Sequence, residues 1–529
     1  MPYIMSSENI ILIWAPEIQA ISALLFLLLY FASTESSLYQ EYVYLIHKSL
    51  TKSVKTSLLS KKSNSIHSAV AGPKNNGSMY FTWCIVWCLI VSLTLFFKPI
   101  NILYASGLFC CNNLICHLDL FLFLFAALCF IITKNWLTVA SVNCVEYGIF
   151  GGIILLGQHF LLMSTDLMSF YICLELQSFS FVILCSLNKR SLYSIEAGMK
   201  YFLLSAFSSC FLLLGIAFIY QTTGITQCKN LESLYFQSST LQNNNLFTIG
   251  IWLVSLTLLW KLAAAPNHLW AADVYTGAYA AVTLLISTLP KFTIFNFFIL
   301  QWHGLWMLCF PNILAIFSAL CLLLGALAAF GQIHIKRLLA YSSIAHIGFL
   351  CMPLVGYSFY DQNIFLPNSY ALWTHLIIYF ITSLIIWALL CRSFFRSTIR
   401  STPQFIFDFS NLYKTQPMIA IALVIVMISL AGLPPSAGFL GKWTIFWGSV
   451  YANNYIILAI ALISTCISSV YYLKLIRISF ISKPTQWSYF GQCASSDAYI
   501  ISICLFLLSV LLWASSPLIL YTHYWSLLV

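Results

Sequence analysis

Charged side chains inside apolar segments are the first residues of this sequence that could carry chemistry. Glu175 lies in YICLELQSFSF, Lys261 precedes Pro266 in KLAAAPNHLW, and Lys442 follows Pro434-Pro435 in LAGLPPSAGFLGKW. A charge in the hydrocarbon core of a bilayer costs at least ~3 kcal/mol, so it seldom persists without a role. A proline there frees a backbone carbonyl, which needs a polar surrounding. Lysines beside broken helices are typical of an ion or proton path.

Glu175 is suited to hold and release a proton together with a lysine partner. We expect Glu175 to face a lysine across the helix bundle; the alternative is a carboxylate capped by neighbouring backbone or hydroxyl groups. A carboxylate–lysine pair titrates as a unit, so separating the partners changes how each one holds its proton. The alternative for Lys261 is an ammonium group that extends to the membrane interface, and its position deep in the segment argues against this.

Two further lysines extend the candidate path. Lys291 follows Pro290 in the next apolar segment, and the interface alternative applies to it as well. Lys200 lies four residues after Glu196. A simple Glu–Lys pair on one helix therefore explains Lys200 as well as a role in proton transfer does.

Two histidines are weaker candidates. His268 lies beside the break at Pro266, two helical turns after Lys261, which places both on one face if the break is mild. His346 lies in AYSSIAHIGF, where neighbouring hydroxyl groups are compatible with a hydrated path. A histidine satisfied within the core is an equally good interpretation of each.

The composition predicts an all-α polytopic membrane protein. The chain has 529 residues, of which 61% are hydrophobic and 7% are charged, whereas a soluble domain carries about 25% charged residues. The apolar segments are about 20 residues long, which suits helices and not the ~10-residue strands of a barrel. They predict fourteen spans, near residues 9–32, 78–98, 117–133, 144–164, 166–187, 197–220, 246–272, 278–300, 306–331, 337–357, 367–391, 416–448, 453–475 and 498–521.

Basic residues between the spans predict the orientation of the chain, because cytoplasmic or matrix loops are rich in lysine and arginine. With the loops numbered in order, the even loops hold Lys98 and Lys229. The odd loops hold a much larger set: Lys48, Lys52, Lys55, Lys61, Lys62, Lys74, Lys134, Lys189, Arg190, Lys336, Arg337, Arg392, Arg396, Arg400, Lys414, Lys474, Arg477 and Lys483. We therefore expect both termini in the outer compartment.

Two similar helix breaks indicate an inverted repeat. Leu262-Ala263-x-x-Pro266 opens the break in the seventh span, and Leu430-Ala431-x-x-Pro434 opens the break in the twelfth. The breaks lie an odd number of spans apart, so the two copies run in opposite directions. Paired broken helices in inverted repeats are typical of transporters. The expected divisions are three N-terminal spans, two five-helix repeats and a C-terminal span, at residues 1–143, 144–300, 301–480 and 481–529.

No motif for a bound cofactor, metal or nucleic acid is apparent. The sequence has no G-x-G-x-x-G after a strand and no P-loop. The 18 cysteines are scattered through apolar segments without a C-x-x-C pair, so they are interpreted as small core residues. A Ser-, Lys- and Asn-rich insert at residues 45–77 suits a mobile loop that touches anionic lipid headgroups, with partner docking as the alternative.

The motifs around the charged residues resemble one family. ELQSFSF, EAGMKYFLLSAFSS, KLAAAPNHLWAADVYTG, STLPK, KRLLAYSSIAHIGF and LAGLPPSAGFLGKW are similar to motifs of the antiporter-like membrane subunits of proton-pumping NADH:ubiquinone oxidoreductase, respiratory complex I. ELQS and EAG-KYF resemble its subunit-2 family in particular. The resemblance runs from about Pro16-Glu17 to the C-terminus.

This resemblance implies a fold and a set of site residues. It implies fourteen helices, with spans 4–8 and 9–13 as inverted repeats and with helices 7 and 12 broken. It also implies a chain of buried ionisable groups along the mid-membrane plane. The residues that match the family's proton-translocating Glu and Lys positions are Glu175, Lys200, Lys261, Lys291 and Lys442.

The resemblance also implies which partners the chain has and which subunits bind the cofactors. The chain would bind no cofactor, because NADH, FMN, the iron–sulfur clusters and ubiquinone belong to other subunits of the complex. The expected partners are the other membrane-arm subunits and membrane lipids, cardiolipin included. A change of charge in a neighbouring subunit would separate or join Glu175 and its lysine partner, which would act on Lys261 and then on Lys291 and pass a proton towards Lys442.

One segment departs from the family pattern. The family reads W-x-P-D-x-Y-x-G-x-P-T-P after the break in the seventh span, whereas this chain has Ala272, Tyr279 and Ala281 at the three proline positions. We expect a different connection between the seventh and eighth spans and an unchanged proton path, because the titratable positions are kept.

Two other functions and two locations remain open. A subunit of a multisubunit Na⁺/H⁺ antiporter is the first alternative, and an assembly scaffold with relict charges is the second. No cleavable presequence is apparent, and the hydrophobicity favours an organelle-encoded protein of the mitochondrial inner membrane. A bacterial inner membrane is the alternative location.

Overall fold

The structure is a computed structural model that describes most of the chain. The described residues are 15–28, 76–96, 98, 102–140, 144–188, 191–237, 244–310, 312–355, 362–392, 394–396, 399–401, 403–410, 412–482, 488–491 and 494–528. The expected insert at 45–77 lies outside this part of the chain up to residue 75.

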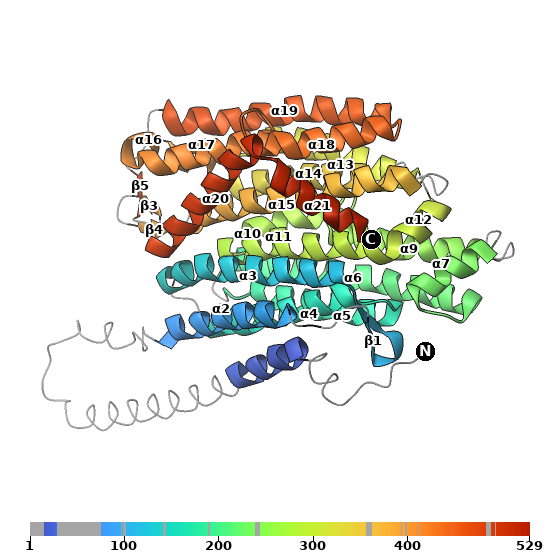
Figure 1. Cartoon of the computed structure of the whole chain (residues 1–529). Helices are drawn as coiled ribbons and strands as arrows, with labels where there is room; N and C mark the ends of the chain where they lie inside the picture. The colour runs from blue at the N-terminus through green and yellow to red at the C-terminus, as the bar shows by residue number, and fades with distance from the viewer. Residues whose placement is uncertain are drawn as a thin grey trace, which may run out of the picture.

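Helices laid side by side form one bundle (Figure 1). Within the described residues, ten helices are long and apolar enough to cross a membrane, and four shorter apolar helices accompany them. Two of the shorter ones are halves of broken spans. The fourteen expected spans are therefore confirmed, because every one contains one of these helices.

The helices are the N-terminal helix Ala15–Leu28, α2 (Asn76–Leu95), α3 (Asn113–Ala140), α4 (Cys144–Met163), α5 (Leu167–Cys185), α6 (Leu192–Thr223), α7 (Cys228–Gln237), α9 (Asn245–Lys261), α10 (Leu269–Gly277), α11 (Ala280–Phe297), α12 (His303–Cys309), α13 (Ile313–Phe330), α14 (Ile335–Cys351), α15 (Gln362–Leu390), α16 (Leu412–Thr415), α17 (Pro417–Ala431), α18 (Ala437–Tyr451), α19 (Tyr455–Phe480), α20 (Ser495–Trp513) and α21 (Ser516–Leu527). The strands are β1 (Ile102–Tyr104), β2 (Phe109–Cys111), β3 (Phe394–Arg396), β4 (Ile399–Ser401) and β5 (Ser488–Phe490).

Two span boundaries differ from the sequence prediction. The eighth span is longer than expected, because a π-helical turn at Phe298–Trp302 joins α11 to α12. The ninth span starts at Ile313 and not near residue 306, since the non-helical backbone of Phe310 ends α12. The last span, expected as one helix, consists of α20 and α21, which meet at Ala514.

Strand pairing in the loops supports the predicted alternation of the spans. β3 pairs antiparallel with both β4 and β5, which joins the eleventh and thirteenth loops. A bridge from His334 to Phe405 joins the ninth and eleventh loops. All are odd loops, and they lie at the left end of the bundle in Figure 1. We call this end the basic face.

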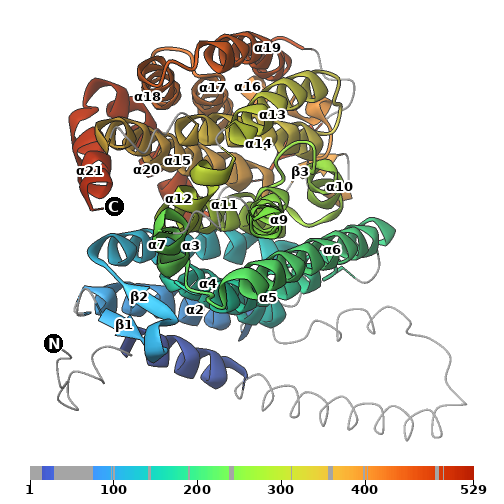
Figure 2. The same cartoon turned by 90° about the vertical axis from the view of Figure 1, so that its right-hand side faces the viewer.

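The even loops meet at the opposite end. β1 and β2 form an antiparallel hairpin in the second loop. Phe109 of that hairpin pairs with Ser164 of the fourth loop, and Asp166 pairs with Gln227 of the sixth. We call this end, which carries β1, β2, α7 and α12, the hairpin face; Figure 2 views the molecule from it. The separation of odd and even loops confirms the order in which the spans cross.

The packing of the helices repeats between the two halves. α4 packs against α5 and α11, and in the second half α13 packs against α14 and α19 in the same way. α6 packs against both halves of the broken seventh span, α9 and α10, and α15 packs against both halves of the broken twelfth span, α17 and α18. In Figure 2 the first set lies in the lower part of the molecule and the second set in the upper part. The expected pair of five-helix repeats, spans 4–8 and 9–13, is therefore present.

Three helices lie at the centre of the bundle. The most apolar stretch of α11 and its extension is 100% buried within this chain. The corresponding stretch is 94% buried in α15 and 89% buried in α14, whereas in α20 it is 22% buried. Side chains on these three helices are therefore shielded from lipid by the chain itself. Charged groups placed there must find their partners inside the protein.

The two helix breaks have a local cause. α17 ends at Gly432, whose φ of +75° is the left-handed conformation that glycine adopts readily. α18 then starts at Ala437, and its Gly438 lies directly against the carbonyl group of Ser429. α9 ends at Lys261, and Ala263 takes a φ of +62° before α10 begins. Both breaks therefore place helix ends inside the membrane region.

Replacing Gly438 by Ala should destabilise the protein. The added methyl group would overlap the Ser429 carbonyl oxygen, and overpacking of this kind costs roughly 1–3 kcal/mol. We expect the thermal aggregation temperature of this chain in detergent-solubilised native membranes to fall by several degrees. Gly331→Ala is the matched control, because no atom lies within 4 Å of the added Cβ. Equal effects of the two changes would contradict the close packing at the break.

Candidate functional site

Glu175 has the lysine partner that the sequence predicted, and the structure identifies it as Lys261. Lys261 Nζ, at the end of α9, lies 3.5 Å from Glu175 Oε1 in the middle of α5. Their side chains are 7% and 14% exposed, so the pair is largely buried. The Ser178 hydroxyl also donates to Glu175 Oε2 over 3.4 Å. Both interpretations of Glu175 from the sequence therefore hold, since the carboxylate has a lysine partner and a hydroxyl cap.

The break in the seventh span gives Lys261 its position. α9 would otherwise continue past this residue, and the ammonium group would lie along a helix and not at its end. The Trp270 indole of α10 donates to the Trp260 carbonyl over 3.1 Å, which satisfies one of the carbonyls freed by the break. A cavity of about 10 Å³ adjoins the ammonium group, close to the smallest volume that holds one water molecule. Its lining includes Tyr201, Ser205 and Ser208.

Lys291 lies in the central helix α11 and is 4% exposed. Pro290 precedes it and cannot donate to the Ile286 carbonyl one turn earlier in the helix. Lys291 Nζ donates to the hydroxyl of Tyr379 on α15 over 3.1 Å. It also lies 5.2 Å from the centre of that ring, which stabilises a cation further.

Two histidines continue the series from Tyr379. His346 Nδ1 on α14 lies 3.3 Å from His375 Nε2 on α15, so one ring can donate to the other. The His346 ring is 5.2 Å from the Tyr379 ring. His375 and Tyr379 are four residues apart on α15, which places both on the same face of that helix. The two rings therefore bridge α14 and α15 at the centre of the bundle.

Lys442 ends the series at the second break. Its Nζ donates to the carbonyls of Leu430 over 3.0 Å and Ala431 over 2.7 Å. These carbonyls belong to the last turn of α17, where a helix has unpaired acceptors and a partial negative charge. The ring centre of Phe349 lies 5.0 Å from the same ammonium group. The break therefore supplies the site that holds this buried cation.

Hydroxyl groups lie between the two lysine sites. Tyr201 is buried and lies within electrostatic range of both Glu175 and Tyr275. Ser343 on α14 lies beside the phenol groups of both Tyr275 and Tyr379. Hydroxyl groups can accept one proton while donating another. Of these side chains, Tyr201 lines the Lys261 cavity and Tyr379 accepts from Lys291.

The charges along this series are unbalanced. In the described part of the chain, no carboxylate lies within 4.0 Å of Lys291 or Lys442, and the salt bridges present involve other groups. An uncompensated buried charge is costly. Lys291, His346, His375 and Lys442 therefore cannot all carry a proton at once, and the arrangement suits a small number of mobile protons.

Lys200 lies apart from this series. Its Nζ is 2.7 Å from Glu196 Oε1 and 2.7 Å from Asp273 Oδ2, and its side chain is 40% exposed. The i,i+4 pair expected as one explanation is confirmed, and Asp273 joins it. Arg337 lies 4.0 Å from the same aspartate. These four side chains form a partly exposed ion cluster on the flank of α6 and α10.

His268 is not brought to the face that the sequence predicted. The turn between α9 and α10 separates it from Lys261, and its Nδ1 lies 3.1 Å from the Pro266 carbonyl oxygen. Its ring packs near Tyr341, with 6.3 Å between the ring centres. No contact joins it to the buried lysines among the residues described. The assumption of a mild break was therefore wrong.

The connection between α10 and α11, where three prolines are replaced, is held by direct contacts. Lys336 Nζ donates to the Ala278 carbonyl over 2.7 Å, and the Tyr147 hydroxyl donates to the Ala281 carbonyl over 3.0 Å. The Tyr279 ring packs edge-on against Trp136 at 5.0 Å. Side chains of other helices therefore fix this short connection from both sides.

Sequence reasoning missed four residues of the series: Tyr201, Tyr275, His375 and Tyr379. A histidine and a tyrosine four residues apart in the eleventh span, THLIIYF, were a usable signal for two of them. Tyrosine is common in apolar helices, so the other two had no distinguishing pattern. Ser343 belongs to the hydroxyl groups beside His346 that the sequence did indicate.

Known proteins are similar in sequence to most of this chain. Residues 164–468 match the model of the family described as NADH:quinone oxidoreductase/Mrp antiporter, TM. The NADH-ubiquinone oxidoreductase chain 2 of Marchantia polymorpha is 30% identical over 467 residues, which cover 86% of this chain and 91% of that protein. The NADH-quinone oxidoreductase subunit N of Pelagibacter ubique is 32% identical over 426 residues, which cover 78% and 86%.

A solved structure is similar as well. A chain of respiratory complex I from Thermus thermophilus superposes with a TM-score of 0.69 at 26% identity, covering 84% of this chain and 93% of that one. The family model covers more than half of the sequence. On these grounds, the chain is a multi-pass membrane protein that belongs to the NADH:quinone oxidoreductase/Mrp antiporter transmembrane family.

Proposed function

We propose that this chain is the antiporter-like chain 2 subunit of a proton-pumping NADH:quinone oxidoreductase, and that it carries protons along its buried series of side chains. The observation that supports this most strongly is the series itself. It runs from Glu175–Lys261 through Lys291 to Lys442, crosses both repeats, and places lysines at two helix breaks. The relatives that match most of the chain are named as subunits of such enzymes.

The first step of the proposed path lies at Glu175. While Glu175 faces Lys261 at 3.5 Å, the carboxylate stabilises the ammonium form. When the two separate, Lys261 loses its counter-ion and is left as a buried cation in apolar surroundings. Its proton then moves to the neighbouring hydroxyl groups, and Lys261 becomes a neutral amine.

The second step passes the proton through the centre. The Tyr379 hydroxyl accepts a hydrogen bond from Lys291, so a proton arriving from Ser343 reaches the lysine when its amine is neutral. From there the His346–His375 pair offers the next acceptors. Lys442 receives the proton last, because the carbonyls at the end of α17 are placed to stabilise its ammonium form.

The proposal includes partners, redox groups and a location. The partners are the other membrane-arm subunits of the enzyme, and the exposed apolar side chains of Ile18, Leu25 and Trp83 suit contact with lipid, cardiolipin included. The redox groups (FMN, iron–sulfur clusters) and the sites for NADH and ubiquinone belong to other subunits. The mitochondrial inner membrane is the proposed location, with the matrix at the basic face.

Lys291→Met should abolish most NADH-driven proton pumping while leaving assembly intact, because methionine fills the site without a titratable group. The measurement is proton uptake per NADH oxidised in membrane vesicles, together with a native gel that is stained for NADH oxidation. Lys414→Met is the control, since Lys414 lies in α16 at the basic face. Normal pumping by assembled Lys291→Met enzyme would remove this residue from the path. Sodium–proton exchange by a chain that runs apart from the NADH-oxidising band would favour the antiporter function.

Tyr379→Phe should slow pumping and leave the fold unchanged. It removes the hydroxyl that accepts from Lys291 and keeps the ring. A hydrogen bond to a charged group is worth about 1.5–3 kcal/mol, which corresponds to a roughly tenfold or larger loss in the rate of proton transfer through this chain. Tyr370→Phe on the same helix is the control. If both variants pump at the same rate, Tyr379 has no part in proton transfer.

A further inference from the structure

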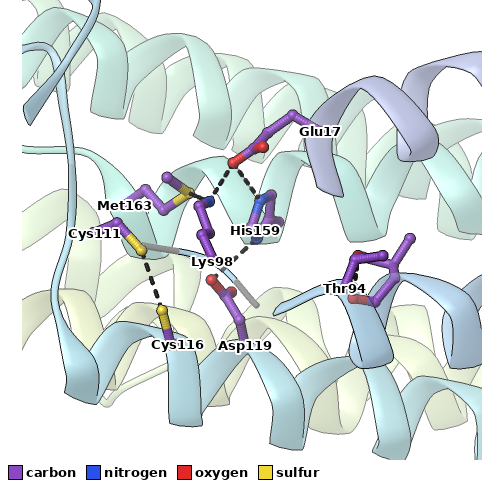
Figure 3. A network of polar contacts seen from close by, with 9 residues as sticks. Glu17, Thr94, Lys98, Cys111, Cys116, Asp119, His159 and Met163 are labelled. Carbon is purple, nitrogen blue, oxygen red and sulfur yellow. Dashed lines mark hydrogen bonds and ion pairs between the residues drawn. The ribbon is translucent and has the colours of Figure 1, made fainter. Parts of the chain in front are cut away.

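A second buried group of ionisable side chains lies outside the series described above (Figure 3). Glu17 comes from the N-terminal helix, Lys98 from the segment after α2, Asp119 from α3 and His159 from α4. Each side chain is at most 2% exposed. We call these four residues the N-terminal cluster. They come from four separate segments, and sequence analysis did not single them out.

The histidine lies between the two carboxylates. His159 Nδ1 is 3.1 Å from Asp119 Oδ2, and His159 Nε2 is 3.5 Å from Glu17 Oε1. A neutral imidazole donates from one nitrogen, whereas an imidazolium donates from both. With both carboxylates and Lys98 charged, a protonated His159 makes the cluster neutral, and a neutral His159 leaves one buried negative charge. The geometry thus provides one site for an exchangeable proton, the imidazole of His159.

The surroundings of His159 define what can act on this proton. The charged groups that face it are Glu17, Asp119 and Lys98, whose Nζ donates to Glu17 Oε1. Cys111 on β2 and Cys116 on α3, with 3.2 Å between their sulfur atoms, lie on the far side of Lys98 and Asp119. α5 also packs along α4, but its carboxylate Glu175 is paired with Lys261.

The N-terminal cluster and the central series have different partners. His159 lies between Glu17 and Asp119, whereas Lys291 donates to Tyr379. Aromatic contacts join α3 to the central helices: Phe121 on α3 packs against Phe292 at 5.2 Å between ring centres, and Phe125 packs against Phe380 at 4.8 Å. The carboxylates that hold His159 are therefore not those of the series that ends at Lys442.

The position of the cluster points to the hairpin face. Asp119 is in the second turn of α3, and His159 is four residues before the end of α4. Lys98 lies in the loop that leads to β1. All three positions are at the end of the bundle that carries the hairpin. A depression of about 230 Å³ opens at the same face, lined by residues that include Cys110, Asn112 and Lys229. Cys110 precedes Cys111 on β2, and Cys111 interacts electrostatically with Lys98 of the cluster, so the strand that lines this depression also borders the cluster.

We propose that His159, held between Glu17 and Asp119, is a second proton-binding site of this chain and that it exchanges its proton with the compartment at the hairpin face. Its four residues are not members of the central series. Its assay rests on the proposed function, because it is read out during NADH-driven pumping. A change in the protonation of His159 alters the net charge of the N-terminal cluster, which lies at the hairpin end of the first three helices.

The test uses inverted membrane vesicles that contain the whole enzyme, so that NADH acts from outside and the hairpin face looks into the lumen. Vesicles are loaded with buffers of different pH, and the initial rate of proton pumping is measured before the lumenal pH changes. In the unaltered enzyme we expect the rate to fall through a single-proton titration step as the lumenal pH is lowered. In His159→Gln we expect this step to be lost.

Three further variants test the role of His159. His117→Gln is the matched control: His117 also lies near the hairpin end of α3, but it packs against Tyr521 and Tyr524 and should retain the step. If His159→Gln fails to assemble, Glu17→Gln and Asp119→Asn serve instead. Each removes one of two counter-ions from the imidazolium and should move the step to lower pH, by about 1 to 3 units for a close charge partner.

The outcomes separate this proposal from the proposed function. Absence of a lumenal titration step in the unaltered enzyme, or its persistence in His159→Gln, would overturn the role of His159. Reduced assembly of the cluster variants with an unchanged pH profile would show that the four residues only hold the first helices together, which would also overturn it. Normal pumping by Lys291→Met with an intact step would instead contradict the proposed path and leave the second site standing.

Discussion

A charge in the interior of a membrane protein must have a compensating partner, and the contact between Glu175 and Lys261 is where this constraint is most finely balanced. The two groups are 3.5 Å apart and largely buried, so each stabilises the charged form of the other. Lys291 and Lys442 have no carboxylate partner among the described residues and depend on a phenol group and on helix-end carbonyls. The proposed transfer of a proton follows from this difference, since loss of the Glu175 contact leaves Lys261 no better compensated than the others.

The broken helices make this arrangement possible. A continuous helix satisfies its own carbonyls and offers nothing to a buried ammonium group. The break after Ala431 leaves carbonyls that Lys442 uses, and the break after Lys261 ends a helix next to Glu175. The almost completely buried helices α11, α14 and α15 lie between the two breaks and carry the hydroxyl and imidazole groups. The inverted repeat thus places two similar helix ends on either side of a protected centre.

Some of this could be predicted from the sequence and some could not. The spans, their order and the two breaks follow from apolar length, loop charge and proline, which are local properties. A lysine partner for Glu175 was predictable because a buried carboxylate needs a counter-ion, but only the packing of α5 against α9 identifies it as Lys261. The position of His268 was not, because the angle of the break decides it. Tyr201 and the N-terminal cluster come together from distant segments, so only tertiary packing reveals them. The roles of the individual site residues remain predictions.

The most direct test of this account is a double-mutant cycle on the pair from which it starts. Proton pumping per NADH oxidised would be measured for assembled enzyme with Glu175→Gln, with Lys261→Met and with both changes. If the two side chains act as one unit, the double variant loses little more than either single variant, as coupled residues do. Losses that simply add, expressed as free energies, would contradict the claim that this ion pair controls the release of the proton.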